Sequence, residues 1–163
     1  MVILYTSDHG KFINLKNITL EEMDAKNIKK NVYVNLTNKC PCACTFCLRK
    51  TKEMTESNNL WLKREPTVEE VIAEFESIDL PAFDEVIFCG FGEPSERIDA
   101  ILEIAKYIKK RCPEMPTRIN TNGLSDLVNK KPTAPLLKGL IDTVSISLNA
   151  PNAEEFLEIT QNI

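Results

Sequence analysis

The sequence predicts an α/β fold built around a parallel sheet. Runs of β-branched and aromatic residues alternate along the chain with stretches of helical period, which is the pattern of strands joined by crossover helices. The chain has 163 residues, of which 43% are apolar and 27% are charged, so it can bury one core. We therefore expect a single domain over residues 1–163. Residues 1–31 would form an N-terminal hairpin and helix, and residues 32–163 would form the sheet with its helices.

The N-terminal unit begins with two short strand patterns. Residues 2–6 and 11–15 flank the turn sequence Asp8-His9-Gly10, which is typical of a β-hairpin. Thr19 is followed three residues later by a glutamate, which is the spacing of a capping box. This spacing predicts a short helix that runs toward Lys30.

The remainder of the chain alternates between strand and helix signals. A second capping box begins at Thr67, and Val68, Val71, Ile72 and Phe75 follow at helical spacing. The predicted strands span residues 32–36, 85–89, 117–121 and 143–148, and the further predicted helices span residues 98–110 and 135–141, with another that begins at residue 153.

Three of the six cysteines indicate an iron-sulfur centre. Cys40, Cys44 and Cys47 follow the first sheet strand at Cx3Cx2C spacing in residues 38–47, here called the cysteine loop. Three thiolates can hold three irons of a [4Fe-4S] cluster and leave the fourth iron open to an exchangeable ligand. A zinc site would need a second Cys or His pair downstream, which is lacking, and a secreted disulfide scaffold would carry more cysteines in a shorter chain.

Other chemically versatile residues have structural interpretations. Cys42 lies between the ligands, and we interpret it as a spectator thiol rather than a member of an alternative CxC pair. Cys89 and Cys112 are interpreted as packing or surface thiols. His9 is the only histidine, so a histidine-rich metallohydrolase site is excluded within this chain. Trp61 is expected to cover the core, and the polar segment 50–59 to be mobile or to pack over the cluster mouth.

Together with Phe46, the cysteine spacing resembles the CxxxCxφC signature of the radical S-adenosylmethionine (radical SAM) superfamily. The resemblance implies a [4Fe-4S] cluster on Cys40, Cys44 and Cys47, with S-adenosylmethionine as the second cofactor and Phe46 beside its adenine. It also implies a partial (β/α) TIM-like barrel of the radical SAM type. This barrel would be short or truncated at the C-terminus, because four strand-helix units fit where the family usually has six.

Three further motifs resemble the family in the expected order. Residues 88–94 resemble its Gly-Gly-Glu-Pro motif, which receives the methionine amino group, with Phe91 in place of the first glycine. Glu93 can accept hydrogen bonds from an ammonium group, and Gly92 beside it would permit close backbone approach. Residues 118–123 resemble the Thr-Asn-Gly stretch, and residues 144–149 the fourth strand. The implied S-adenosylmethionine contacts are Phe46, Gly92, Glu93, Pro94, Asn120, Thr121, Asn122, Ser145, Ser147 and Asn149.

A narrower resemblance concerns the partners. Residues 3–6 and 33–49 resemble the small radical SAM proteins associated with TatD-type hydrolases, so such a hydrolase is a possible partner protein. An external electron donor such as flavodoxin or ferredoxin is also implied. A homodimer is a further expectation, because an open sheet edge needs cover.

Two classes of function follow. The favoured one is an enzyme that reductively cleaves S-adenosylmethionine, forms a 5'-deoxyadenosyl radical and abstracts hydrogen from an unidentified substrate. The alternative is a non-catalytic iron-sulfur module that transfers electrons or senses redox state in a complex. Glu93, Asn122 and Ser147 discriminate between them, because an electron carrier does not need a sulfonium-binding pocket. The catalytic residues that would act on the substrate are unknown from the sequence.

Charge and hydropathy limit the expected partners and cellular location. The net charge of −4 gives no footprint for nucleic acid, and the basic run 106–111 is interpreted as the solvated end of a helix. No apolar stretch approaches the ~20 residues that span a bilayer, and the N-terminus lacks a signal-peptide pattern. We expect a cytoplasmic protein, where a reducing environment keeps cluster thiols free.

Overall fold

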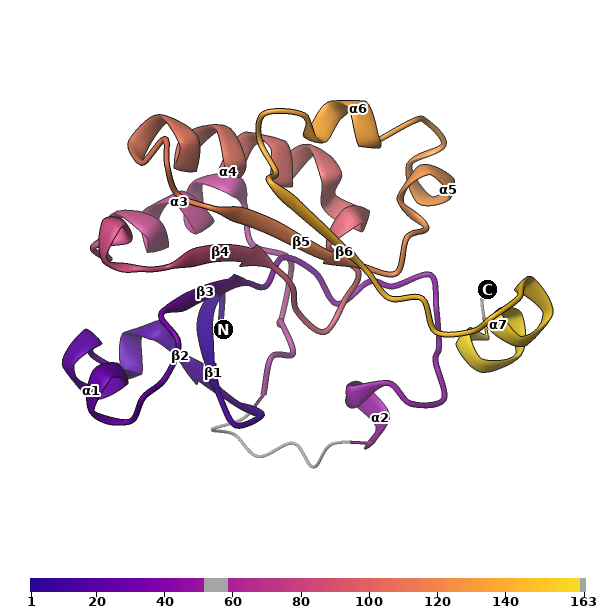
Figure 1. The fold of residues 1–163 in the computed structure, drawn as a ribbon, viewed down its shortest axis with the longest axis horizontal. Coiled ribbons are helices and arrows are strands. Elements are labelled where there is room, and N and C mark those ends of the chain that lie inside the picture. The colour runs from indigo at the N-terminus through magenta and orange to yellow at the C-terminus, as the bar shows by residue number, and fades with distance from the viewer. Residues whose placement is uncertain (52–58, 162–163) are drawn as a thin grey trace.

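The structure, a computed structural model, describes residues 1–51 and 59–161. Its centre is a six-stranded sheet with the strand order β2-β1-β3-β4-β5-β6, and the sheet is not closed (Figure 1). This arrangement confirms the predicted α/β class and the partial barrel. The strands are β1 (Leu4–Asp8), β2 (Lys11–Asn14), β3 (Asn31–Val34), β4 (Glu85–Phe88), β5 (Thr117–Thr121) and β6 (Thr143–Ile146).

Strand pairing divides the sheet into two parts. Strands β3 to β6 pair in parallel, with Val34 opposite Phe88 and Phe88 opposite Ile119. The predicted hairpin forms as β1 and β2, and β1 also pairs antiparallel with β3, where Leu4 lies opposite Val34. The hairpin therefore extends the sheet beyond β3, a pairing that the sequence did not predict.

The helices begin largely where the capping signals place them. Thr19 and Thr67 each accept a hydrogen bond from the backbone N–H three residues on, and the reciprocal glutamate bond is present at both. A cap of this kind typically contributes ~1 kcal/mol. The helices are α1 (Leu20–Ala25), α2 (Leu48–Thr51), α3 (Val68–Glu76), α4 (Ile98–Arg111), α5 (Ser125–Asn129), α6 (Ala134–Leu137) and α7 (Ala153–Thr160), with 3-10 turns at Leu15–Asn17, Leu80–Ala82 and Pro94–Arg97.

One face of the sheet carries the main core. Figure 1 shows α3, α4 and α6 gathered on the same side of β4 and β5. Phe75 of α3, Ile101 and Ile104 of α4 and Phe88 of β4 are fully buried there. On α3, Val71 is buried with Phe75, whereas Val68 and Ile72 lie half-buried at the edge of the stripe. Burying such side chains contributes ~1.5–3 kcal/mol each, which fixes the helices over the sheet.

The basic end of α4 is not simply solvated, which corrects the sequence-based interpretation. Lys109 Nζ donates to the Met115 carbonyl at 2.8 Å and to Asp142 Oδ2 at 2.6 Å. Arg111 donates to the carbonyls of Phe75 and Ile78. These two side chains therefore tie α4 to its neighbours.

Trp61 and the ends of two later elements differ from the sequence-based expectations. Trp61 is 42% exposed, and its ring packs edge-on against Phe91 at a centroid distance of 5.5 Å rather than over the main core. The strand predicted to reach residue 148 ends at Ile146, and α6 ends at Leu137. The expected role of the polar segment 50–59 falls mainly on residues 52–58, which lie outside the described residues.

Hydropathy of the described helices is moderate. Across residues 1–51 and 59–161, no helix combines the length and apolar character needed to cross a bilayer.

Candidate active site

The carboxyl ends of the four parallel strands bring the predicted motifs together. The cysteine loop follows β3, the Gly92-Glu93-Pro94 segment follows β4, Asn122 follows β5, and Ser147 and Asn149 follow β6. Because these strands are parallel neighbours in register, their carboxyl ends share one edge of the sheet. Four segments distant in sequence thus meet at one place.

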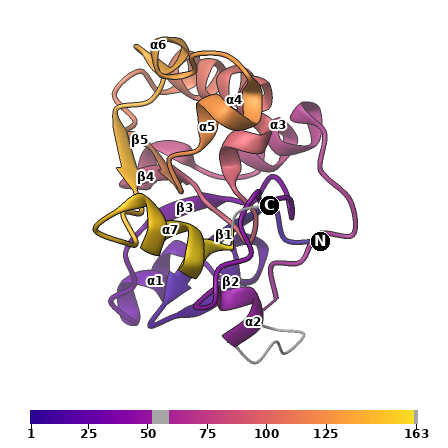
Figure 2. The same cartoon turned by 90° about the vertical axis from the view of Figure 1, so that its right-hand side faces the viewer.

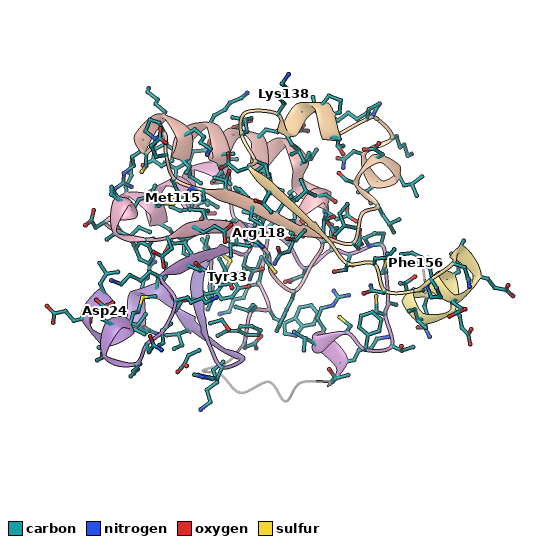
Figure 3. The ribbon with its side chains drawn as sticks, viewed as in Figure 1. Asp24, Tyr33, Met115, Arg118, Lys138 and Phe156 are labelled. Carbon is teal, nitrogen blue, oxygen red and sulfur yellow. The ribbon has the colours of Figure 1, made fainter. Side chains whose placement is uncertain are left out.

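A cavity, here called the cysteine cavity, lies at this edge and has a volume of about 220 Å³. Every predicted site residue except Ser145 lines it. Ser145 lies on β6 itself, where its hydroxyl oxygen accepts a hydrogen bond from Arg118 at 3.3 Å. Figure 3 labels Arg118 near the centre of the molecule. The lining residues are Cys40, Cys42, Cys44, Phe46, Cys47, Cys89, Gly90, Gly92, Glu93, Pro94, Asn120, Thr121, Asn122, Ser147 and Asn149.

The thiols of the cysteine cavity differ in environment. Cys40, Cys44 and Cys47 are partly exposed, whereas Cys42 is 3% exposed. Burial raises the pKa of Cys40 and raises the pKa of Cys42 to about 11, with the nearby Cys40 adding to the effect at Cys42. Burial likewise raises the pKa of Cys89, so thiolate formation in this cavity needs a compensating positive charge.

The donor set suits a cluster better than a single ion. Within the part of the chain that the structure describes, no three His, Cys, Asp or Glu side chains converge on a point that would hold one metal ion. A structural zinc site requires four ligands at ~2.0–2.3 Å from one centre. In an iron-sulfur cluster, by contrast, cysteine thiolates bind different irons. The three thiols of the motif line one cavity, where each could bind a different iron.

The cysteine loop is hydrogen-bonded to the end of α7, which is distant in the sequence. The Ala43 and Thr45 amides donate to the carbonyls of Thr160 and Ile159 at 2.9 and 3.0 Å. Figures 1 and 2 show α7 away from the sheet, beside the chain that carries the cysteine loop. The sequence indicated the helix at this position but not its contact with the loop.

Gly92 has a packing role that the sequence did not predict. Its amide donates to the Thr37 carbonyl at 3.0 Å, and the Glu93 amide donates to the Lys39 carbonyl at 2.7 Å. A Cβ at position 92 would lie 2.4 Å from the first of these oxygens and 2.5 Å from the second. The glycine therefore permits close approach of the chain's own backbone before Cys40, and it also lines the cysteine cavity.

Phe91 stands where the radical SAM motif has glycine, and its side chain does not line the cysteine cavity. It is buried in a separate small cluster with Tyr5 and Leu60. The backbone path through the motif is therefore compatible with a large residue at this position.

Glu93 is the most unusual charged group of the site. It is 4% exposed, and its Oε1 accepts hydrogen bonds from the Ser95 amide at 3.1 Å and the Thr121 hydroxyl at 2.7 Å. Its Oε2 accepts a hydrogen bond from the Asn122 amide at 2.8 Å. Among the described residues, no Lys, Arg or His forms an ion pair with it. A buried carboxylate without a cation carries a desolvation cost that a cationic ligand would offset.

Asn122 faces the thiols. Its Nδ2 lies 3.7 Å from Cys42 Sγ and 3.9 Å from Cys40 Sγ, while its Oδ1 accepts a hydrogen bond from the Leu124 amide at 2.9 Å. The sequence placed Asn122 near a ligand but did not predict this orientation toward sulfur.

Three lining residues were not among the predicted site residues. Cys42 and Cys89 had been interpreted as a spectator and a packing thiol, and Gly90 had no assigned role. The signal for the last two was their position inside the motif after β4, because a residue that directly follows a parallel strand lies at the sheet edge where the loops meet.

Comparison with known proteins adds an independent observation. Residues 34–163 match the family model described as Radical SAM superfamily. The chain is 34% identical over 114 residues to a protein of Methanocaldococcus jannaschii named as a putative glycyl-radical enzyme activating enzyme. This match covers 67% of this chain and 39% of that protein. It is 27% identical over 131 residues to the GTP 3',8-cyclase of Paenarthrobacter nicotinovorans, which covers 78% of this chain and 34% of that protein. The matched regions thus span well under half of each relative.

Proposed function

This chain belongs to the radical SAM superfamily, and from that premise we propose that it cleaves S-adenosylmethionine reductively and directs the resulting radical to hydrogen abstraction from a substrate. One observation carries the proposal. The three thiols of the Cx3Cx2C motif line the same cavity as Glu93, a buried carboxylate without a cationic partner among the described residues. A cluster ligand set and a binding group for an ammonium ion thus lie side by side.

Cys40, Cys44 and Cys47 would hold a [4Fe-4S] cluster with one iron left for an exchangeable ligand. The chemistry that a bound cluster supplies is transfer of one electron to the sulfonium, which breaks the C5'–S bond to give methionine and a 5'-deoxyadenosyl radical that takes a hydrogen atom from the substrate. An external electron donor such as flavodoxin or ferredoxin would replace that electron.

The protein's own groups would bind and orient the S-adenosylmethionine. Glu93 would accept the ammonium group, because the donors from Thr121 and Asn122 already fix its two oxygens in place. Ser147 and Asn149 line the β6 side of the cysteine cavity and offer polar groups to the ribose and the carboxylate. Phe46 is 50% exposed at the cavity, where its ring would cover the adenine.

The comparisons do not support a particular substrate. One relative is named for activating a glycyl-radical enzyme and the other for cyclising GTP, so their common region supports radical initiation and not one substrate. Our proposal keeps a TatD-type hydrolase as a possible partner, on the resemblance of residues 3–6 and 33–49. Homodimer formation and a cytoplasmic location also stay predictions.

The alternative function, a non-catalytic iron-sulfur module, explains less of the site. Electron transfer needs the thiols but gives no reason to bury Glu93 without a cation beside them. The same carboxylate has a clear purpose if a cationic ligand enters the cysteine cavity.

The test is a turnover measurement on the reconstituted chain. Under anaerobic conditions with dithionite and S-adenosylmethionine, the wild-type chain should release 5'-deoxyadenosine, measured by mass-resolved chromatography. Cys44→Ala should abolish the product because one thiolate ligand is lost. A chain with a full complement of cluster that neither binds S-adenosylmethionine nor releases product would contradict the proposal and favour the electron-transfer module.

A further inference from the structure

A second cavity borders the cysteine cavity, and the function proposed above does not yet assign it a role. It has a volume of about 230 Å³ and shares Cys47, Cys89 and Gly90 with its neighbour. We call it the aromatic cavity, because Tyr5, Phe12 and Phe91 form much of its remaining wall, together with Leu60 and Arg49. We propose that the aromatic cavity binds a single aromatic ring that carries a carboxylate on a short chain.

Ring contacts fix the shape of the aromatic cavity. Phe12 packs edge-on against Tyr5 at 5.5 Å and against Phe91 at 5.8 Å between centroids. Tyr33, labelled in Figure 3, stacks on Tyr5 at 5.1 Å, and the Tyr5 hydroxyl donates to the Cys89 carbonyl at 3.2 Å. Edge and face contacts of this kind also favour an added aromatic ring, by ~0.5–1.5 kcal/mol beyond its buried area.

Arg49 supplies the charge that selects an anion. Its Nη1 donates to the Asn38 carbonyl at 2.8 Å, and its guanidinium lies 5.5 Å from the centroid of the Trp61 ring. Both contacts hold the guanidinium in place and leave further N–H donors for a ligand. Within residues 1–51 and 59–161, no carboxylate pairs with it. A guanidinium on a largely apolar wall binds a carboxylate through strong, charge-assisted hydrogen bonds.

Size limits the ligand. A cavity of about 150 Å³ in another protein holds benzene, so about 230 Å³ is enough for one ring with a short substituent. The ring would contact the aromatic wall while the carboxylate reaches Arg49. The ligand class is therefore a small aromatic carboxylate.

Position suggests what the ligand is for. Because Cys47, Cys89 and Gly90 belong to both cavities, a ligand in the aromatic cavity would lie next to the site where the radical is generated. On this inference, which rests on the proposed function, the aromatic carboxylate is the substrate or the recognised part of it. Binding itself does not depend on that function.

Isothermal titration calorimetry on the anaerobically reconstituted 163-residue chain tests the binding. N-acetyl-L-phenylalanine should bind saturably, and at least about tenfold more tightly than N-acetyl-L-phenylalanine amide, which lacks the carboxylate. N-acetyl-L-alanine, which lacks the ring, should bind more weakly by a similar factor. Trp61 is the only tryptophan of the chain and contacts both Arg49 and Phe91, so its fluorescence should change as the aromatic ligand binds.

Variants separate recognition from folding. Arg49→Gln should reduce the affinity for N-acetyl-L-phenylalanine to that for the amide, whereas the matched Arg64→Gln, outside the cavity wall, should leave it unchanged. The thermal unfolding midpoint checks that each variant is folded. If Arg49→Gln does not fold, Phe12→Ala in the hairpin tests the site instead. Its affinity for N-acetyl-L-phenylalanine should fall by at least about tenfold, because the ring contacts are missing.

Absence of saturable binding, or binding that neither Arg49→Gln nor Phe12→Ala weakens, would overturn the inference. Release of 5'-deoxyadenosine without any aromatic ligand is measured separately. A chain that cleaves S-adenosylmethionine but binds no aromatic carboxylate disproves the aromatic site alone. A chain that binds the carboxylate but has a loaded cluster and cleaves nothing disproves the proposed function and leaves the binding site standing.

Discussion

Glu93 couples two loops through one carboxylate. Its Oε1 accepts a hydrogen bond from the Ser95 amide in its own loop, while the Thr121 hydroxyl at the end of β5 and the Asn122 amide just after β5 also donate to it. The orientation of the carboxylate therefore depends on correct register between β4 and β5. A side chain fixed in this way can bind a cationic group without reorganising, which favours affinity.

We predict that Glu93→Gln lowers the affinity for S-adenosylmethionine by at least about tenfold, because an amide cannot offer the charge that an ammonium group recognises. Iron content should not change, since Glu93 is not among the proposed cluster ligands. Equilibrium dialysis with S-adenosylmethionine measures the effect, with Glu96→Gln as the matched control. Unaltered affinity in Glu93→Gln would show that the cofactor pocket is wrongly assigned.

Gly92→Ala should disturb the cluster site although it changes none of the three cysteines that would bind the irons. The added Cβ would press on the carbonyls of Thr37 and Lys39, which lie just before Cys40, at a cost of ~1–3 kcal/mol. We expect a lower urea midpoint and a lower iron content after reconstitution. Gly10→Ala places its Cβ in open space but at a φ of +82°, so it should cost ~1 kcal/mol of stability and keep the iron content. Equal iron content in both variants would refute this role of Gly92.

Sequence motifs named the residues that line the cysteine cavity but not the contacts that hold them there. The cysteine spacing and the Gly-Glu-Pro segment named side chains that now line one cavity. The clash that keeps Gly92 small and the direction of the Asn122 amide depend on neighbours across the sheet. Such contacts are set by tertiary packing, which local sequence does not encode in a readable form.

At the scale of elements, two capping boxes mark where α1 and α3 begin. The predicted capping box on Thr67 forms at the N-terminus of α3, and Arg64 binds the same glutamate, Glu70, with Nη1 to Oε2 at 2.7 Å. The hydrogen bond from Arg64, followed by that from the Thr67 backbone, lowers the pKa of Glu70 to about 2. Ionised Glu70 is thus the form that the folded state favours.

A pH dependence follows with a definite sign. Because the pKa of Glu70 is lower in the folded chain than in the unfolded chain, its contribution to stability is present above the unfolded pKa and is lost as the pH falls from about 4.5 toward 2. Glu70→Gln keeps a capping side chain but not the charge. Urea unfolding at two pH values in this window should therefore show a smaller loss of stability for the variant than for the wild type. A wild-type chain whose loss equals that of the variant would contradict this account.

The sequence did not predict α2 or α5. The N-cap residue of α5, Leu124, makes no side-chain capping bond, so nothing marked its start. The hairpin was recognised from its turn, yet two of its contacts join distant parts of the sequence. Leu4 pairs with Val34 of β3, and the Ala43 amide in the cysteine loop donates to Thr160 of α7, separations that lie beyond the reach of local periodicity. These contacts had to come from the structure.

At the scale of the whole molecule, the sheet edge organises two neighbouring cavities. The loops after β3 to β6 form the cysteine cavity, and the N-terminal hairpin adds the aromatic wall of the second. The alternation of strands and helices predicted the parallel sheet, and the resemblance to the radical SAM motifs predicted which residues would meet at its edge. The second depends on the hairpin joining the edge of β3, which places Tyr5 and Phe12 beside Cys47.

The most direct test of the central claim is the electron paramagnetic resonance spectrum of the reduced, reconstituted chain with and without S-adenosylmethionine. If the cluster on Cys40, Cys44 and Cys47 has an open iron beside Glu93, the cofactor should change the signal of the wild-type chain. The change should require much higher cofactor concentrations in Glu93→Gln. A reduced cluster whose spectrum is indifferent to S-adenosylmethionine at saturating concentration would contradict the assignment of this cavity as the radical-generating site.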